Sequence, residues 1–500
     1  MFKYNKLIIN GIIILFFVFC LSPKVFAFDV NQNVYINQSY SFNSDSSIKV
    51  VLLKSTNQAL FYTDSTWWSK LSSSEQSNIQ NKIYDLSTEL EYRIKPILNS
   101  NYGFEADPIN SLDKRLIIIL TPMIEGIQGY IKTSDFVLKV KNQSSNEGNI
   151  IYLNGDKVKT VETNILNSFL AHEFTHLISY NQKYLKQNLV EDLWLEEARA
   201  EYAPTLLGYN SNWDNSYLKI RATDFFQNNS ISFMDWSNTM SNYSSINLFA
   251  TYLAEQYGKE ILVNSIHSNK IGIDSLNEAL KSRGVAEDFN QIYQNWLIAN
   301  ILNNCSVSLR YCYQNINLKN LAILPANFYL PVNNNSALAI SDTLVPYMAK
   351  YQKISGGDVN LNFDFENTPD NLTQKIPYLL VNKNGSKQLY FFEFQKNKSQ
   401  KIVIPDFNKE ITTLIFIPYL IRNDDNYGIR SIFKWSVQTG QGTTVPSTGT
   451  TVAIPSTKPA TSSESTTAMI LRQQQIIALQ TKLIALLLEL ISSLKLRLGI

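Results

Sequence analysis

Histidine and cysteine are scarce in this sequence, which has only 3 of each among its 500 residues. Because these side chains are the main nitrogen and sulfur ligands of zinc, such chemistry has few places to occur. Cys20 lies in an apolar N-terminal run, which leaves Cys305 and Cys312 as the one remaining pair. In an oxidising compartment this pair can close a small disulfide loop, and two free thiols are the alternative.

The sequence also lacks an excess of charge of either sign. It has 44 basic and 42 acidic residues, which gives a formal net charge of +2 at pH 7. This balance offers no electrostatic reason to expect a nucleic acid or an acidic substrate. No nucleic-acid partner is therefore predicted. The length is sufficient for two folded domains and a tail.

The first 27 residues carry the pattern of a secretory signal peptide. Lys3 and Lys6 precede an apolar run over residues 7–21, and residues 25–27 (V-F-A) form a short cleavage pattern. We predict that residues 1–27 are removed and that the protein is secreted or extracellular, with association at the cell surface left open. An uncleaved N-terminal membrane anchor is the alternative.

Two of the histidines form the pattern H-E-x-x-H, at His172, Glu173 and His176. Residues four apart lie on one face of an α-helix, so both imidazoles can point at one metal ion while Glu173 lies beside it. The alternative is a helix with two hydrogen-bonded histidines, because the pattern also occurs by chance. Apolar residues at helical spacing predict a buried helix over about 163–180. These residues are Ile165, Leu166, Phe169, Leu170, Leu177 and Ile178.

A second helical segment, Asp192–Tyr202, can supply a third ligand. Glu197 and Glu201 lie four residues apart in it and share one face of the helix. Two His and one Glu with an open fourth position are the ligand set of a catalytic zinc rather than a structural one. Such a zinc polarises a carbonyl and lowers the pKa of its bound water. Glu173 would then be the general base for this zinc-activated water.

These two segments resemble the gluzincin metallopeptidases of the thermolysin type. The residues W-L-E-E-A-x-A-E-Y from Trp194 are similar to the W-L-N-E-G-x-A-x-Y line of the hyicolysin-like and aminopeptidase-like branches. The resemblance, which covers about residues 48–330, implies that Glu197 is the third ligand. Glu196 replaces the usual Asn, and it stays open whether Glu196 or Glu197 reaches the metal. Glu201 matches the acid that orients the first histidine from behind.

The resemblance extends to a third segment, residues 243–258. It is similar to a helix downstream of the zinc whose leading Tyr, here Tyr243, donates a hydrogen bond to the developing oxyanion. In the family, an exposed sheet edge receives the substrate backbone, and we expect this edge between Gln128 and Leu153. His267 is interpreted as a surface or helix-end histidine, with a second oxyanion donor as the alternative.

The remaining pattern gives an α+β fold class. We expect a thermolysin-like zinc peptidase domain, with a mixed sheet and a helical subdomain, followed by a β-sandwich and a C-terminal helix. Strands are predicted at 47–53, 59–63, 116–120 and 150–153, the last ending in a turn at Asn154-Gly155. The predicted boundaries are a signal peptide at 1–27, an α/β N-terminal part of the catalytic domain at 28–160, its helical zinc-binding part at 161–329, a β-sandwich at 330–437, a Thr/Ser/Pro-rich linker at 438–467 and an amphipathic or coiled-coil helix at 468–500.

The C-terminal helix is apolar at three- and four-residue spacing. Lys482 and Glu489 interrupt its apolar stripe. We therefore favour self-association or tethering to a cell or membrane surface over membrane insertion.

The sequence thus predicts a secreted zinc metallopeptidase with a protein or peptide substrate. An endopeptidase is preferred over an aminopeptidase, because the G-x-M-E-N segment that binds a free amino terminus has no counterpart and Ile124-Glu125-Gly126 does not fit it. The alternative is a non-catalytic cell-surface binding or structural protein with a structural zinc site.

Overall fold

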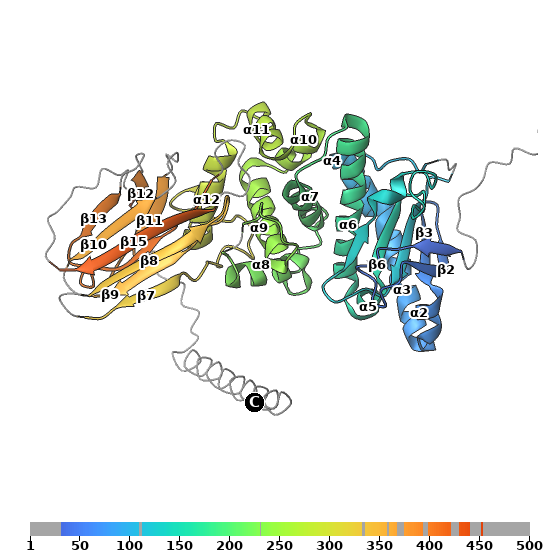
Figure 1. The fold of residues 1–500 in the computed structure, drawn as a ribbon, viewed down its shortest axis with the longest axis horizontal. Helices are drawn as coiled ribbons and strands as arrows, with labels where there is room; N and C mark the ends of the chain where they lie inside the picture. Colours follow the sequence, from blue (N-terminus) through green and yellow to red (C-terminus); the bar gives the residue numbers. More distant parts are fainter. Residues whose placement is uncertain are drawn as a thin grey trace, which may run out of the picture. The chain divides into compact units, whose positions relative to one another are not determined.

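In the residues it describes, the computed structural model of this chain has an α+β architecture of helices and three sheets (Figure 1). The predicted signal peptide, most of the predicted linker and the predicted C-terminal helix lie outside these residues. Within the described ranges, no helix combines the length and apolar composition needed to cross a bilayer. The described ranges are 32–109, 113–230, 232–332, 336–357, 360–367, 375–393, 399–421, 430–440 and 452–453.

The first sheet is built around three parallel strands. Its six strands follow the order β1-β2-β3-β4-β6-β5, in which β3, β4 and β6 are parallel and the other neighbours are antiparallel. The four predicted strands are found as β2, β3, β4 and β6. The strand bounds are β1 (Asn33–Tyr35), β2 (Ser47–Ser55), β3 (Ala59–Asp64), β4 (Leu116–Thr121), β5 (Gly129–Ile131) and β6 (Ile150–Asn154).

The central strand β4 is buried on both faces, as its uninterrupted apolar sequence indicates. Leu116, Ile118 and Leu120 face a core formed with the helices that cover one side of the sheet. Ile117 and Ile119 face a second core formed with the N-terminal strands β1 and β2. The sheet is therefore a rigid layer against which the H-E-x-x-H helix can pack.

Helices cover one face of this sheet. A capping box opens α3: the Ser72 side chain accepts from the backbone N–H of Glu75, and the Glu75 side chain accepts from that of Ser72. The prediction of a turn at Asn154-Gly155 is wrong. The short helix α5 begins there instead, and the Asn154 side chain caps it by accepting a hydrogen bond from the backbone N–H of Asp156. The helices are α2 (Ser65–Lys70), α3 (Ser73–Glu89), α4 (Lys95–Tyr102), α5 (Gly155–Thr160) and α6 (Thr163–Ser179).

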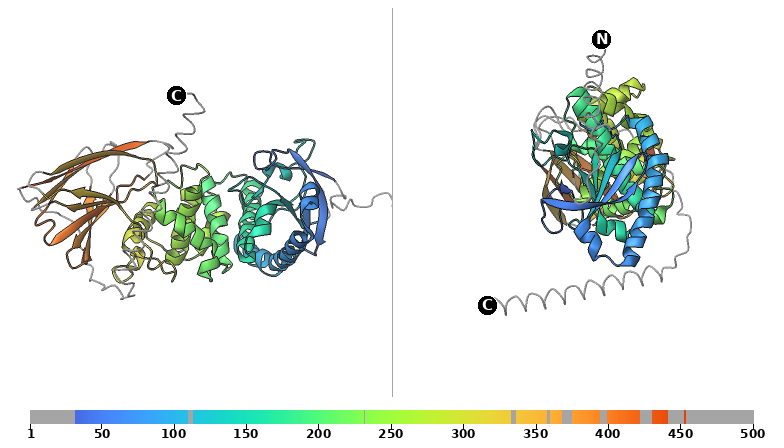
Figure 2. Two further views of the ribbon diagram at one scale, coloured as in Figure 1. Left: turned by 90° about the horizontal axis from the view of Figure 1, so that it is seen from below. Right: turned by 90° about the vertical axis from the view of Figure 1, so that its right-hand side faces the viewer.

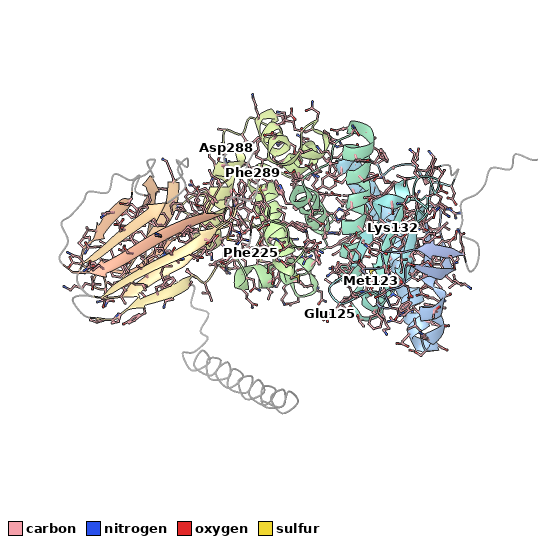
Figure 3. The ribbon with its side chains drawn as sticks, in the orientation of Figure 1. Met123, Glu125, Lys132, Phe225, Asp288 and Phe289 are labelled. Carbon is pink, nitrogen blue, oxygen red and sulfur yellow. A yellow bond between two sulfur atoms is a disulfide. The ribbon has the colours of Figure 1, made fainter. Side chains whose placement is uncertain are left out.

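The next part of the chain is helical, as predicted. Its core gathers large aromatic side chains, among them Trp194, Phe225, Phe289 and Trp296, and Figure 3 labels two of these, Phe225 and Phe289. A disulfide joins Cys305 and Cys312 after the last of these helices. Of the two alternatives for this pair, the disulfide loop is therefore observed rather than two free thiols. The helices are α7 (Leu193–Leu206), α8 (Tyr217–Gln227), α9 (Met240–Tyr257), α10 (Glu260–His267), α11 (Gly272–Ser282) and α12 (Phe289–Leu302).

Two further sheets form two layers in the C-terminal part (Figure 2). One has the order β13-β10-β15-β8 and is antiparallel throughout. The other has the order β16-β12-β11-β14-β9-β7, with β7 and β9 parallel. Across the layers, the Phe363 ring lies 5.4 Å from that of Phe392 and 4.9 Å from that of Phe416. This packing is what alternating apolar residues in short strands predict.

The bounds of these strands are β7 (Ala326–Leu330), β8 (Ala337–Leu344), β9 (Gln352–Gly356), β10 (Leu361–Asn367), β11 (Lys375–Asn382), β12 (Lys387–Glu393), β13 (Gln400–Ile404), β14 (Ile411–Phe416), β15 (Ser431–Thr439) and β16 (Val452–Ala453). Their core is continuous with that of the helical part. The rings of Tyr347 and Tyr293, for example, lie 5.3 Å apart.

Candidate metal centre

The helix α6 carries the H-E-x-x-H residues against the first sheet. Every residue from Ile165 to Ser179 is buried, and the predicted bounds of about 163–180 match the observed ones. The helix α7 packs beside it (Figure 1). Two adjacent buried helices thus bring together residues that lie about 20 positions apart in the chain.

His172, His176 and Glu197 form a compact triangle of ligand atoms. The two Nε2 atoms lie 3.1 Å apart, and Glu197 Oε2 lies 3.3 Å from that of His172 and 3.5 Å from that of His176. Zinc bonds of about 2.0–2.1 Å in a tetrahedron separate neighbouring ligand atoms by about 3.3–3.4 Å. The triangle therefore has the size of one face of a zinc tetrahedron. Among the described residues, these three are the one group of this kind.

The chemistry of these atoms also fits a cation. Within the described structure, the buried Glu197 Oε2 has no hydrogen-bond donor. Burial opposes ionisation of Glu197, but the imidazoles of His176 and His172 outweigh this and hold its pKa well below the usual range. A buried carboxylate that stays charged while facing two imidazole nitrogens is a ligand set for zinc.

Glu173 is buried beside this triangle rather than part of it. Burial raises the pKa of its carboxyl, and the nearby imidazoles of His172 and His176 act in the opposite direction. It also contacts the sheet at Gly129, where an added Cβ would lie 3.0 Å from Glu173 Cγ and 3.1 Å from Oε1. The same Cβ would lie 2.9 Å from the backbone oxygen of Tyr152, so a side chain at this position would meet both the neighbouring strand and the carboxylate, which explains the glycine.

Glu201 lies behind His172 in a fully buried network. Its Oε1 is 3.5 Å from His172 Nδ1. The carboxylate accepts from Arg221 Nη2 at 2.6 Å and from Arg221 Nε at 2.9 Å. Tyr217 and Asn247 each donate a further hydrogen bond to it, at 3.0 Å. This network fixes the position of Glu201 and with it the face that His172 presents.

Glu196 lies on the other side of the site, behind His176. Its Oε1 is 3.2 Å from His176 Nδ1, the ring nitrogen that faces away from the triangle. Glu196 is therefore placed to orient an imidazole, whereas Glu197 lies among the ligand atoms. Burial lowers the pKa of His176, but Glu197 and Glu196 outweigh this and raise it well above its ordinary value.

Tyr243 lies near the opening of α9 and faces the same site. Its ring centroid is 6.4 Å from that of His172, and its hydroxyl donates to Asn238 Oδ1 at 2.7 Å. Burial raises the pKa of this hydroxyl, and the charges of Glu197, Glu201 and Glu173 raise it further. Tyr243 therefore stays protonated and can donate a hydrogen bond at neutral pH.

Apart from the fully buried Glu201, the acidic, histidine and tyrosine residues described above line a cleft of about 630 Å³. One wall is β5, the last strand of its sheet in the described order. Gln128 O accepts a hydrogen bond from Asn154 N, so the backbone groups of Gln128 point toward β6. In an antiparallel pair the backbone groups of successive residues point alternately toward and away from the partner strand, so those of Gly129 and Ile131 point outward. An exposed sheet edge thus runs past Glu173, inside the range of 128–153 that the sequence indicated.

No sequence pattern predicted some of the residues at the site. Arg221 and Tyr217 come from α8, and the cleft is also lined by Tyr40 from the N-terminal segment. That segment is fastened to the region after β5, where Lys132 Nζ donates to Tyr35 O at 2.9 Å (Figure 3 labels Lys132). His267, by contrast, is exposed at the end of α10 and does not line the cleft, in agreement with its interpretation as a helix-end residue.

A His-His-Glu group with a buried carboxylate at the wall of an open cleft is the arrangement of a metal-dependent hydrolase. Over 194 residues, the chain is 25% identical to the neutral metalloprotease ShpI of Staphylococcus hyicus. This stretch covers 34% of the chain and 42% of ShpI, so the chain spans less than half of the length of this relative. No family model matches the chain. The similarity and the ligand triangle together support a metallopeptidase.

Proposed function

We propose that this protein is a secreted zinc endopeptidase of the gluzincin type, in which His172, His176 and Glu197 hold the ion. The observation that carries the proposal is the triangle of ligand atoms, 3.1–3.5 Å on each side, with Glu173 beside it on the wall of an open cleft. A structural zinc site is closed by four protein ligands, whereas three ligands beside a cleft leave a position for substrate. The similarity to a neutral metalloprotease supports the same class.

The bound ion would supply a Lewis acid that polarises the scissile carbonyl and lowers the pKa of water. Glu173 takes a proton from the attacking water and passes it to the amide nitrogen that leaves. Its raised pKa suits this role, because the carboxylate must accept a proton and then release it. Tyr243 donates its hydroxyl proton to a hydrogen bond with the developing oxyanion, in exchange for its bond to Asn238.

Peptide substrates would bind along β5. The outward backbone groups of Gly129 and Ile131 can pair with an extended chain, which thereby adds a strand to the sheet. Glu173 adjoins Gly129, so the scissile bond of a chain paired there lies next to the general base. The lack of a counterpart to the G-x-M-E-N segment that binds a free amino terminus favours an endopeptidase. Secretion follows from the signal-peptide pattern of residues 1–27.

The test is hydrolysis of casein by the purified protein and by Glu173→Gln, each with and without a chelator, together with the zinc content of both. We expect activity that the chelator abolishes, and a loss of about 100- to 10,000-fold in Glu173→Gln at unchanged zinc content. Glu162→Gln changes an exposed acid before the first turn of the same helix and should keep full activity. Equal inactivity of wild type and Glu173→Gln at full zinc loading would favour the rival, a binding or structural protein.

A further inference from the structure

A second hollow adjoins the cleft at the far end of β5. It has a volume of about 530 Å³, within the range of about 300–1,000 Å³ typical of ligand pockets. Three residues line both it and the cleft: Ile131, Thr133 and Glu196. The two spaces therefore adjoin at the end of the edge strand, and Glu196, which contacts His176 of the candidate metal site, lies at their boundary.

Apolar and aromatic side chains form part of the lining of this hollow, namely Ile131, Val137, Tyr180, Tyr184, Leu189 and Val190. Phe136 stacks on Tyr180 at 4.4 Å between ring centroids, and Tyr180 stacks on Tyr184 at 5.0 Å. Tyr180 and Tyr184 belong to a π-helical turn, Tyr180–Leu185, that extends α6 beyond the histidines. Val190 lines the same hollow and is 74% exposed. An exposed valine beside stacked tyrosines offers a surface that water covers poorly and an apolar side chain would cover well.

Lys183 and Glu191, two of the charged residues that line the hollow, already have partners. Lys183 Nζ donates to the carbonyl oxygens of Ser268 and Lys270, at 2.8 and 2.6 Å. Glu191 accepts from Arg199 at 2.8 Å and from the backbone of Gly272 at 2.7 Å. Because these charges are satisfied within the protein, the hollow is suited to an apolar occupant rather than to an ionic one.

The hollow lies within reach of a substrate paired with β5. Gly129 adjoins Glu173, and Ile131 is two residues further along the strand, or about 7 Å at a rise of about 3.4 Å per residue. Thr133 lies beyond it, at the start of the next turn. A substrate chain that follows the edge from the reacting bond therefore enters the hollow with its second or third residue.

We propose that this hollow, walled by Tyr180, Tyr184 and Val190, is a specificity subsite for a large aromatic or aliphatic side chain two or three residues from the cleaved bond. The inference rests on the proposed peptidase function and adds its substrate class. The enzyme would accordingly prefer apolar segments of proteins, the kind exposed when a protein unfolds. It would cut polar segments slowly.

The first test maps the cut sites in a casein digest by mass spectrometry. Wild type should show Phe, Tyr, Trp, Leu or Ile enriched two or three residues from the cut, on one side of it. Val190→Asp should abolish this enrichment, because a carboxylate in the apolar wall would be desolvated by the bound side chain. Val140→Asp changes a valine that is 86% exposed outside the hollow and should retain it. The absence of enrichment in wild type would overturn the proposal.

The second test measures binding without catalysis, in zinc-loaded Glu173→Gln. The probes are a labelled peptide with Phe three residues from its centre on both sides, and the same peptide with Ser at these positions. We expect the Phe peptide to bind at least about tenfold more tightly than the Ser peptide. When Val190→Asp is added, the ratio of the two Kd values should fall close to one. Equal binding of both peptides overturns the subsite. A preference for Phe in a protein that cleaves no casein would retain the subsite and refute the peptidase.

Discussion

Replacing Glu197 and Glu196 with Gln, one at a time, tests which of the two adjacent carboxylates holds the ion. Glu197 Oε2 lies 3.3 and 3.5 Å from the two imidazole nitrogens of the ligand triangle. Glu196 instead contacts the outer nitrogen of His176, at 3.2 Å. The two changes alter the same net charge and the same side-chain volume, so a difference between them reports position alone.

The magnitudes follow from these positions. Zinc binding to a four-ligand site is worth about 10–16 kcal/mol, so one ligand contributes about 3 kcal/mol. Glu197→Gln should therefore raise the zinc Kd by about 100-fold or more. Loss of an outer carboxylate raises it by about 10- to 100-fold, and Glu196, whose side chain is 28% exposed, should fall near the lower limit.

The assay is competition for zinc with a chromophoric chelator at neutral pH, with circular dichroism to establish that each variant is folded. Glu125→Gln removes another acid from the cleft wall, labelled in Figure 3, and should leave the zinc Kd unchanged. A larger effect of Glu196→Gln than of Glu197→Gln would refute the ligand assignment. It would mean that α7 is rotated by one residue relative to its position here.

Two further predictions concern buried charges. Arg221→Met should destabilise the protein by about 3–5 kcal/mol in urea unfolding, because it leaves Glu201 buried without its guanidinium. Lys219→Met changes another residue of α8 and breaks its exposed pair with Asp214, which precedes the helix; it should cost under about 1 kcal/mol. Glu255 is the second case: burial raises its pKa to about 7, so the folded state holds a proton that the unfolded state releases near its ordinary value of 4.5. The contribution of this group to stability is complete below pH 4.5 and is lost as the pH rises through 7. Glu255→Gln should therefore be more stable than wild type at pH 8. Its free energy of unfolding should also fall less between pH 5 and pH 8. An unchanged pH dependence in the variant would contradict the assigned pKa.

The sequence was informative where a local pattern determines the structure. The helix α6 was predicted to within about a residue, because its apolar residues follow the helical period and its histidines share one face. The strands β4 and β6 were recognisable as short apolar runs. The ligand residues His172 and His176 follow from the same local geometry, since four residues make about one helical turn.

Other features depend on contacts between distant segments and could not be derived locally. The choice between Glu196 and Glu197 depends on the rotation of α7, which is set by the packing of Trp194 and Leu195 in the helical core. Arg221, which pairs with Glu201, has no periodic relation to it. The edge strand β5 has only three residues and begins with Gly129, so its propensity is weak. Its position is fixed by pairing with β6.

The ligand triangle also joins two hydrophobic cores. The helix α6 is buried with the first sheet, whereas the first half of α7 is buried in the aromatic core of the helical part. The core of the first sheet also includes Ala203, Tyr217 and Ile266 from the helical part, and the triangle is complete only when the two cores are packed together. For the proposed zinc site this means that a half-folded chain offers no complete set of ligands, so we expect the zinc content of a preparation to follow the fraction of fully folded protein.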